Sequence, residues 1–286
     1  MKLKTGKRKV NRTAAGNVAV FLFLLLFGVF FLLPIVYAIA TAFKPLNEIF
    51  IFPPRLIVKH PTTQNFLKLS QVLRDYFVPF SRYFFNSLFI TVLGTVGHII
   101  LAGMAAYPMA KHRFYGQKML NRLIVTALLF SSSVTYISQY IVLSATQMID
   151  TYLAVLLPAL QTTLGLYLMM NFMKGLPDAM LEAARIDGAG EFYIFWHIVM
   201  PNVKPAWLTL MIFQVQALWN SSGGGFLYSE ELKTLPSVLA TIAAGGNVRA
   251  GVTAAASLIM MLPPIFLFVL LQSRVIETMS TSGMKD

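Results

Sequence analysis

The sequence predicts an all-α integral membrane protein that crosses the bilayer with six transmembrane helices. Of its 286 residues, 57% are hydrophobic and 12% are charged, whereas soluble domains carry about 25% charged residues. Several uncharged stretches reach the roughly 20 helical residues needed to cross the hydrocarbon core. The net charge of +12 could indicate nucleic-acid binding. Most basic residues flank apolar stretches, however, which is typical of an oriented membrane protein.

The chain begins with a basic segment, residues 1–16, followed by an apolar stretch at 17–43. A signal peptide is the competing interpretation, but its apolar region would cover only about 7–15 residues. We therefore expect 17–43 to be a retained first span with the N-terminus in the cytoplasm. Residues 44–83 contain five prolines, which predicts an irregular external loop.

The other five spans are expected within residues 84–276. They are placed at 84–110, 120–144, 152–173, 205–222 and 251–275, with a cytoplasmic loop at 174–204, an external segment at 223–250 and a cytoplasmic tail at 277–286. This topology puts 15 Lys and Arg residues inside and eight outside, as the positive-inside rule favours. Six of those eight lie in the 44–83 loop, against the trend. Pro263 and Pro264 should break or kink the last span, because proline lacks a backbone N–H.

No acidic residue falls in the middle of a predicted span. Ion-coupled carriers usually place carboxylates within the membrane, so a carrier driven by ions is disfavoured. The chain also lacks the GxxxxGK[ST] phosphate-binding motif, and we expect any ATP hydrolysis to take place on a partner chain. No catalytic arrangement is visible, so the chain is not predicted to be an enzyme. There is no cysteine, and no second histidine or acid is spaced to join the mid-span His98 in a metal site.

Neutral polar and aromatic side chains within the spans mark a possible path for a hydroxyl-rich neutral solute. Amides could hydrogen-bond such a solute, and aromatic rings could stack on sugar rings. The alternative is that the amides hydrogen-bond neighbouring helices and the aromatics anchor the interface. The candidate path residues are Gln139, Tyr140, Gln214, Gln216, Trp219 and Asn220.

The loop at 174–204 is a charged region, punctuated by Gly and Pro, between two long apolar stretches. Pro177 and Asp178 are typical of a helix start, with proline in the first turn and an acid near the positive end of the helix dipole. Gly188 and Gly190 predict a stop and a sharp turn. A second short helix is expected from about Glu191 to Val199. Two short helices joined at a glycine elbow form a knob suited to docking.

The spacing Glu182-Ala183-Ala184, three residues, Gly188, nine residues, Ile198 and then Pro201 resembles the EAA loop of permease subunits in binding-protein-dependent ABC importers. The continuation Asp187-Gly188-Ala189 is most similar to the carbohydrate branch, related to the maltose permeases. Met200 stands where this family usually has leucine. An ordinary cytoplasmic loop rich in helix formers is the alternative interpretation of these residues.

The resemblance implies a type I ABC importer permease fold with cytoplasmic N- and C-termini in a bacterial cell membrane. It implies that the 174–204 loop docks on the ATPase through Glu182, Ala183, Ala184, Asp187, Gly188, Ala189, Ile198 and Pro201. The expected partners are a homologous second permease, two ATPase subunits that bind ATP and Mg, and an extracytoplasmic solute-binding protein. No cofactor is expected on this chain. The expected solute is a sugar or oligosaccharide. A permease for a non-sugar solute and a stand-alone carrier or channel remain alternatives.

Overall fold

A computed structural model describes residues 14–74, 78–130 and 132–282, and within these ranges the chain is helical and has no β-strand. The α-helices are α1 (Ala14–Ala42), α2 (Leu46–Ile49), α3 (Gln64–Arg74), α4 (Phe80–Lys111), α5 (Gln117–Ala127), α6 (Ser132–Ala145), α7 (Leu153–Leu160), α8 (Thr163–Lys174), α9 (Asp178–Ile186), α10 (Glu191–Ile194), α11 (Met200–Asn202), α12 (Lys204–Trp219), α13 (Leu235–Ala243) and α14 (Ala250–Ser282). A π-helix (Phe195–Val199) links α10 to α11, and a 3₁₀ turn (Asn247–Arg249) precedes α14.

Four helical segments of the described chain are long and apolar enough to cross a membrane: 15–42, 80–111, 153–174 and 250–272. A fifth is obtained if the bent pair 191–202 and 204–219 counts as one span. The six-span count and the cytoplasmic placement of both termini therefore stay predictions. Most of the basic segment 1–16 and the last four residues of the tail lie outside the described residues.

The predicted span 120–144 is not one helix, because the chain turns between α5 and α6. Backbone bonds tighten there: Leu129 N–H donates to Thr126 O at 3.0 Å and Phe130 N–H to Ala127 O at 3.3 Å, which is an i to i−3 spacing. Three consecutive serines follow at 131–133, and serine hydroxyls compete with helical hydrogen bonding. A hydropathy argument did not detect this break, because long apolar stretches lie on both sides of the serines.

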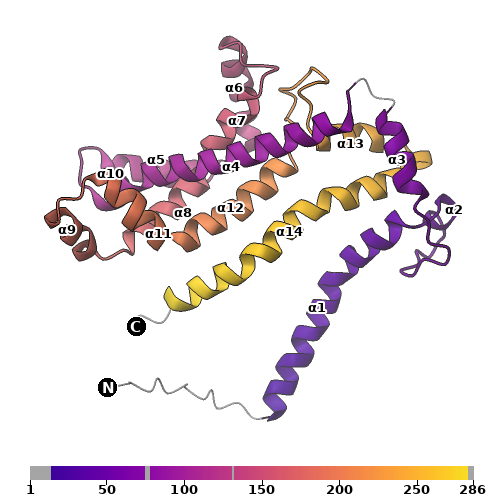
Figure 1. Ribbon diagram of the computed structural model, residues 1–286, viewed down its shortest axis with the longest axis horizontal. Helices are drawn as coiled ribbons and strands as arrows, with labels where there is room; N and C mark the ends of the chain where they lie inside the picture. Colours follow the sequence, from indigo (N-terminus) through magenta and orange to yellow (C-terminus); the bar gives the residue numbers. More distant parts are fainter. Residues whose placement is uncertain (1–13, 75–77, 131, 283–286) are drawn as a thin grey trace.

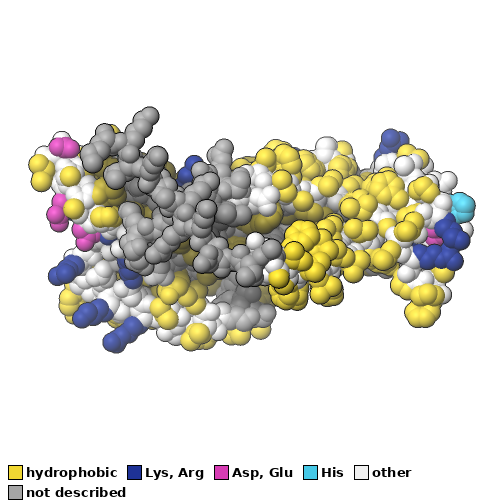
Figure 2. Space-filling view, turned by 90° about the horizontal axis from the view of Figure 1, so that it is seen from below, with side chains coloured by type: hydrophobic (Ala, Val, Ile, Leu, Met, Phe, Trp, Pro, Cys, Tyr) yellow, Lys and Arg dark blue, Asp and Glu magenta, His cyan; other side chains and the backbone are white. Residues whose placement is uncertain are grey.

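The helices are arranged lengthwise, with two different ends (Figure 1). Helices α2, α3 and α13 gather at one end, and α9 to α11 lie at the opposite end. Helix α4 runs between the two ends and packs on α7, α8 and α12. Seen from below, hydrophobic side chains cover much of the middle of the molecule, whereas Lys and Arg side chains lie at its two ends (Figure 2). This distribution is that of a protein spanning a bilayer along its long axis.

The first helix is apolar on all sides and stands away from the bundle over much of its length (Figure 1). Its side chains from Val20 to Leu33 are exposed, with Phe31 at 69% and Leu26 at 67%. Within the chain, α1 contacts mainly α14. A helix that is hydrophobic all round and unpacked is stable only in lipid or against another apolar surface, so α1 depends on its membrane surroundings.

The paired prolines of the last span do not break it, contrary to one of the two expected outcomes. Helix α14 continues from Ala250 to Ser282 through Pro263 and Pro264. Pro264 has no N–H to offer the carbonyl of Met260, four residues earlier, and the indole N–H of Trp219 on α12 donates to that carbonyl at 3.0 Å. Freed carbonyls within a membrane need such a partner. Trp219 therefore helps α14 to remain helical at its prolines.

Candidate functional site

The 174–204 loop contains the two short helices that the sequence predicts, joined at a glycine. Helix α9 ends in a Schellman motif: the Gly188 N–H donates to Arg185 O, and the Ala189 N–H donates to Ala184 O, each at 3.0 Å. Gly188 has φ +82°, a left-handed conformation that glycine adopts without a steric penalty. Both hydrogen bonds lie within the chain, so the elbow is built without help from a partner.

One face of the loop packs inward and the other is free. Leu181 is 1% exposed and Ala184 9%, and both belong to the apolar core around Met169, Met173 and Phe195. Among the predicted coupling residues, Glu182, Ala183, Asp187, Gly188 and Pro201 are exposed, whereas Ala189 and Ile198 are half-buried and Ala184 is buried. The structure thus brings these residues together on one knob at the end of the molecule where α9 lies (Figure 1).

Polar contacts fasten the start of α9 to the end of α4. Lys111, whose side chain is 5% exposed, lies with its Nζ 2.6 Å from Asp178 Oδ1, and it also donates to the carbonyl of Leu176. The hydrogen bond from Lys111 to Asp178 lowers the pKa of the Asp178 carboxyl below its usual value. Lys111 was counted in the sequence only among the basic residues expected inside. Its contact with Asp178 could not be predicted, because the two residues are far apart in sequence.

A second set of contacts holds the start of α10. Glu191 accepts from Arg185 Nε at 2.7 Å through Oε1 and from the hydroxyl of Tyr107 at 2.7 Å through Oε2, and His112 Nε2 lies 3.4 Å from Oε2. Arg185 therefore links the end of α9 to the start of α10, and Tyr107 links the start of α10 to α4.

Along the chain, the knob continues into α12 through a sharp bend. The axes of the helical segments 191–202 and 204–219 differ by 77°. Val203 at the bend is 1% exposed, and Trp207 on α12 donates its indole N–H to Met200 O at 3.1 Å, across the bend. The bend is thus packed and hydrogen-bonded.

The predicted solute-path residues fall into separate places. Gln216 and Asn220 are exposed and line a groove of about 500 Å³ between α12, α13 and α14, which Thr253 and Ser257 also line. None of the described residues that line this groove is charged. Its polar lining consists of amides and hydroxyls, set among Ala, Met, Leu, Ile and Pro side chains, and the Asn220 amide donates to the Gln216 carbonyl at 2.8 Å.

Two other predicted path residues are committed to contacts between helices. Gln214 is 7% exposed and donates to the Ala159 carbonyl at 2.7 Å, and Trp219 is 2% exposed and bonded to α14. In this conformation neither offers a free polar or aromatic face to a solute. Gln139 and Tyr140 lie on α6, away from the groove, where the Tyr140 hydroxyl is 3.3 Å from that of Tyr228.

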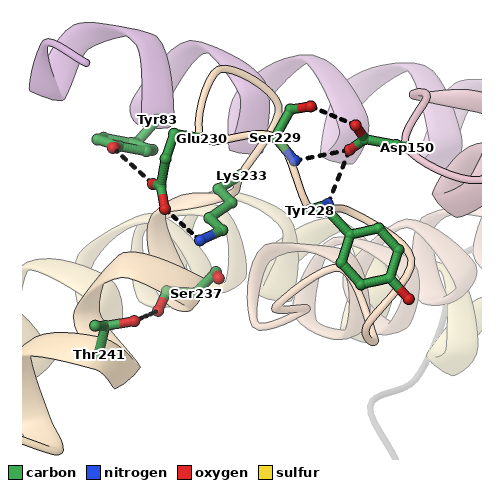
Figure 3. Close-up of polar contacts among 8 residues, drawn as sticks. All are labelled: Tyr83, Asp150, Tyr228, Ser229, Glu230, Lys233, Ser237 and Thr241. Atoms are coloured by element: carbon green, nitrogen blue, oxygen red, sulfur yellow. Dashed lines mark hydrogen bonds and ion pairs between the residues drawn. The ribbon is translucent and has the colours of Figure 1, made fainter. Parts of the chain in front are cut away.

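The predicted external segment is fastened to the neighbouring helices (Figure 3). Asp150 accepts from the backbone N–H groups of Tyr228 and Ser229, both at 2.8 Å, and from the Ser229 hydroxyl. Glu230 accepts from the Tyr83 hydroxyl at 3.2 Å and forms an ion pair with Lys233. These contacts give the segment a defined shape at the end opposite the knob.

His98 joins the two halves of the fourth predicted span. It is 1% exposed, and its Nδ1 lies 2.9 Å from Leu160 O, while Nε2 lies 2.8 Å from the Thr162 hydroxyl. Helix α7 ends at Leu160, so the imidazole bonds a carbonyl that the helix leaves free. This is a structural contact at the junction of α7 and α8.

Comparison with known proteins agrees with this geometry. Protein LplC of Bacillus subtilis is 31% identical over 239 residues, covering 79% of this chain and 76% of the relative. The arabinooligosaccharides transport system permease protein AraQ of Halalkalibacterium halodurans is 27% identical over 292 residues, covering 98% and 99%. The fold is similar to a chain of a bacterial ABC transporter that imports the acidic polysaccharide alginate, with a TM-score of 0.76 at 21% identity over 92% of this chain and 98% of that chain.

The family model described as the inner membrane component of binding-protein-dependent transport systems matches residues 14–281, nearly the whole chain. The matched region contains the knob, the bend and the groove. The chain belongs to this family of inner membrane transport components.

Proposed function

We propose that the chain is one of two permease subunits of an ATP-driven importer for a neutral sugar or oligosaccharide in a bacterial cell membrane. The observation that carries the proposal is the exposed knob that continues through a packed 77° bend into α12. Such a lever converts movement of a docked partner into movement of a span. The partners would be a homologous permease, two ATPase subunits that bind ATP and Mg, and an extracytoplasmic solute-binding protein.

Two observations support a sugar as the solute. Relatives are named for arabinooligosaccharide transport and, for MelC of Bacillus subtilis, for import of melibiose, raffinose and stachyose. The groove beside α12 carries amides and hydroxyls and, in its described lining, no charge. Neutral hydroxylated solutes can exchange hydrogen bonds with such a surface without leaving a charge unpaired.

In this mechanism, closure of the ATPase pair on ATP moves the knob, and the packed bend carries that motion to α12. Lys111 and Glu191 pass part of the same displacement to α4. Gln216 lies on α12 and Asn220 follows its last residue, both at the groove, so a rocking movement of α12 changes how accessible the groove is to a solute. The chain supplies the docking knob and part of the solute path, and ATP hydrolysis takes place on the ATPase subunits.

The test is a detergent pull-down of the chain followed by an ATPase assay with and without the solute-binding protein. We expect an ATPase to co-purify and its hydrolysis to rise when the binding protein and its sugar are added. A stable, monomeric preparation without any ATPase would refute the proposal and favour a stand-alone carrier. Stimulation only by non-sugar ligands would refute the assignment of the solute.

A further inference from the structure

The knob is hollow on its exposed side. A depression of about 500 Å³ lies at the elbow between α9 and α10, lined by Asp187, Gly188, Gly190, Tyr193, Ile198 and two alanines. Neither Gly188 nor Gly190 has any atom within 4 Å of the position that a Cβ would occupy. The absence of two side chains therefore keeps this space open.

The walls of the hollow differ in chemistry. Ile198 and the two alanines form an apolar floor, and Tyr193 supplies an aromatic ring that is 55% exposed and stacks on His197 at 4.1 Å between ring centroids. Asp187 supplies a carboxylate at the rim. An apolar floor below an aromatic face and an acid matches a long cationic side chain, whose stem is apolar and whose head is charged.

The acid at the rim has no counter-charge within the described residues. Of the four acids in the loop, Asp178 pairs with Lys111 and Glu191 pairs with Arg185, which leaves Glu182 and Asp187 outside the ion pairs of the described chain. Acidic side chains are visible at this end of the molecule, beside Lys and Arg side chains (Figure 2). The two carboxylates outside the ion pairs, Glu182 and Asp187, favour a cationic group on the partner.

We propose that the hollow receives an arginine or lysine side chain of the ATPase subunit, with its head against Asp187 and Tyr193. This inference rests on the proposed function, because it names the chemistry by which the ATPase is held. The contact is reciprocal: the knob enters the ATPase surface, and a side chain of the ATPase enters the knob. Coupling then depends on the emptiness of the elbow as well as on its exposed acids.

The test fills the hollow from Gly190. This residue has φ −73° and ψ 158°, an extended conformation that any L-residue adopts. In the intact importer, we expect Gly190→Phe to reduce the recovered ATPase at least tenfold, and Gly190→Ala to reduce it less. Gly28→Phe is the control for bulk, because Gly28 lies on α1 with nothing within 4 Å of a Cβ. Wild-type recovery with Gly190→Phe would overturn the proposal.

The charge is tested separately with Asp187→Asn. We expect several-fold lower recovery of the ATPase that co-purifies with the wild-type chain, and a weaker dependence on salt, since an exposed ion pair is screened. Unchanged recovery at both low and high salt would overturn the cationic assignment. A wild-type pull-down without ATPase would instead refute the proposed function itself, so the two failures are distinguishable.

A labelling experiment covers the case in which Gly190→Phe does not fold. The chain has no cysteine, so Ala189→Cys introduces a single thiol in the lining of the hollow and leaves Asp187 in place. We expect a maleimide to label it in the free chain and the bound ATPase to protect it at least tenfold. Lys68→Cys in the predicted external loop is the control whose labelling the ATPase should not change. Equal labelling at position 189 with and without the ATPase would overturn the proposal.

Discussion

The contact between Trp219 and Met260 allows a quantitative test of how α14 tolerates its prolines. Trp219→Phe keeps an aromatic ring in the buried site but removes the indole N–H that donates to the Met260 carbonyl at 3.0 Å. Pro264 cannot replace this donor. A buried carbonyl left without a partner costs roughly 1–3 kcal/mol, whereas measured hydrogen bonds between membrane helices average about 0.6 and reach about 1.7 kcal/mol. We expect a loss of about 1 kcal/mol, a fall in Tm of roughly 2–4 °C for a chain of this size.

The assay is thermal unfolding of the purified chain, followed as a double-mutant cycle. Pro264→Ala restores an N–H to the Met260 carbonyl, so Trp219→Phe should cost little in that background. Trp196→Phe is the control, because Trp196 has no side-chain hydrogen bond within the described residues and is only half-buried. An equal cost of Trp219→Phe with and without Pro264 would refute the reasoning, since the penalty would then come from packing alone.

Three further predictions concern other features of the chain. Gly188→Val should destabilise the elbow by roughly 1–2 kcal/mol, because φ is positive there, whereas Gly188→Asn should retain more stimulated ATP hydrolysis; equal activities would contradict this. Thr95→Val should raise Tm, because the Thr95 hydroxyl is buried without a hydrogen-bond partner among the described residues; a lower Tm would argue against it. Protease resistance of the loop should persist above pH of about 4 and fall as Asp178, whose pKa Lys111 lowers, is protonated at lower pH. Lys111→Met should weaken this pH dependence without abolishing it, because Glu191, whose pKa the hydrogen bond from Arg185 lowers, is protonated at low pH as well; an unaltered profile would refute the attachment through Lys111.

The local features of the loop could be predicted because neighbouring residues determine them. Asp178 begins α9, Gly188 takes the positive φ and Glu191 begins α10, and each of these follows from capping and turn preferences. The family resemblance is carried by the same residues, and the match over 14–281 confirms it. Local rules were sufficient at this site.

Features that depend on distant residues could not be predicted. The break between α5 and α6 lies at three serines between apolar stretches, which hydropathy averages over, and the continuity of α14 at Pro264 depends on Trp219, 45 positions earlier in the sequence. Gln214, Gln216, Trp219 and Asn220 were predicted together as solute-path residues, because all four are polar or aromatic positions at the end of one predicted span. Only packing distinguishes Gln214 and Trp219, which bond other helices, from Gln216 and Asn220, which line the groove.

The contacts of α4 and α12 indicate which elements move together. Helix α4 is fastened at one end to the knob through Lys111 and at the other end through Asn86, whose amide donates to Glu231 O at 2.8 Å and accepts from the Tyr152 hydroxyl at 2.7 Å. Helix α12 is joined to the knob by the packed bend. Between α12 and α14, the described side-chain hydrogen bond is that from Trp219 to Met260. A displacement of the knob should therefore carry α4 and α12 as one body, and the groove beside α14 is where their relative position can change.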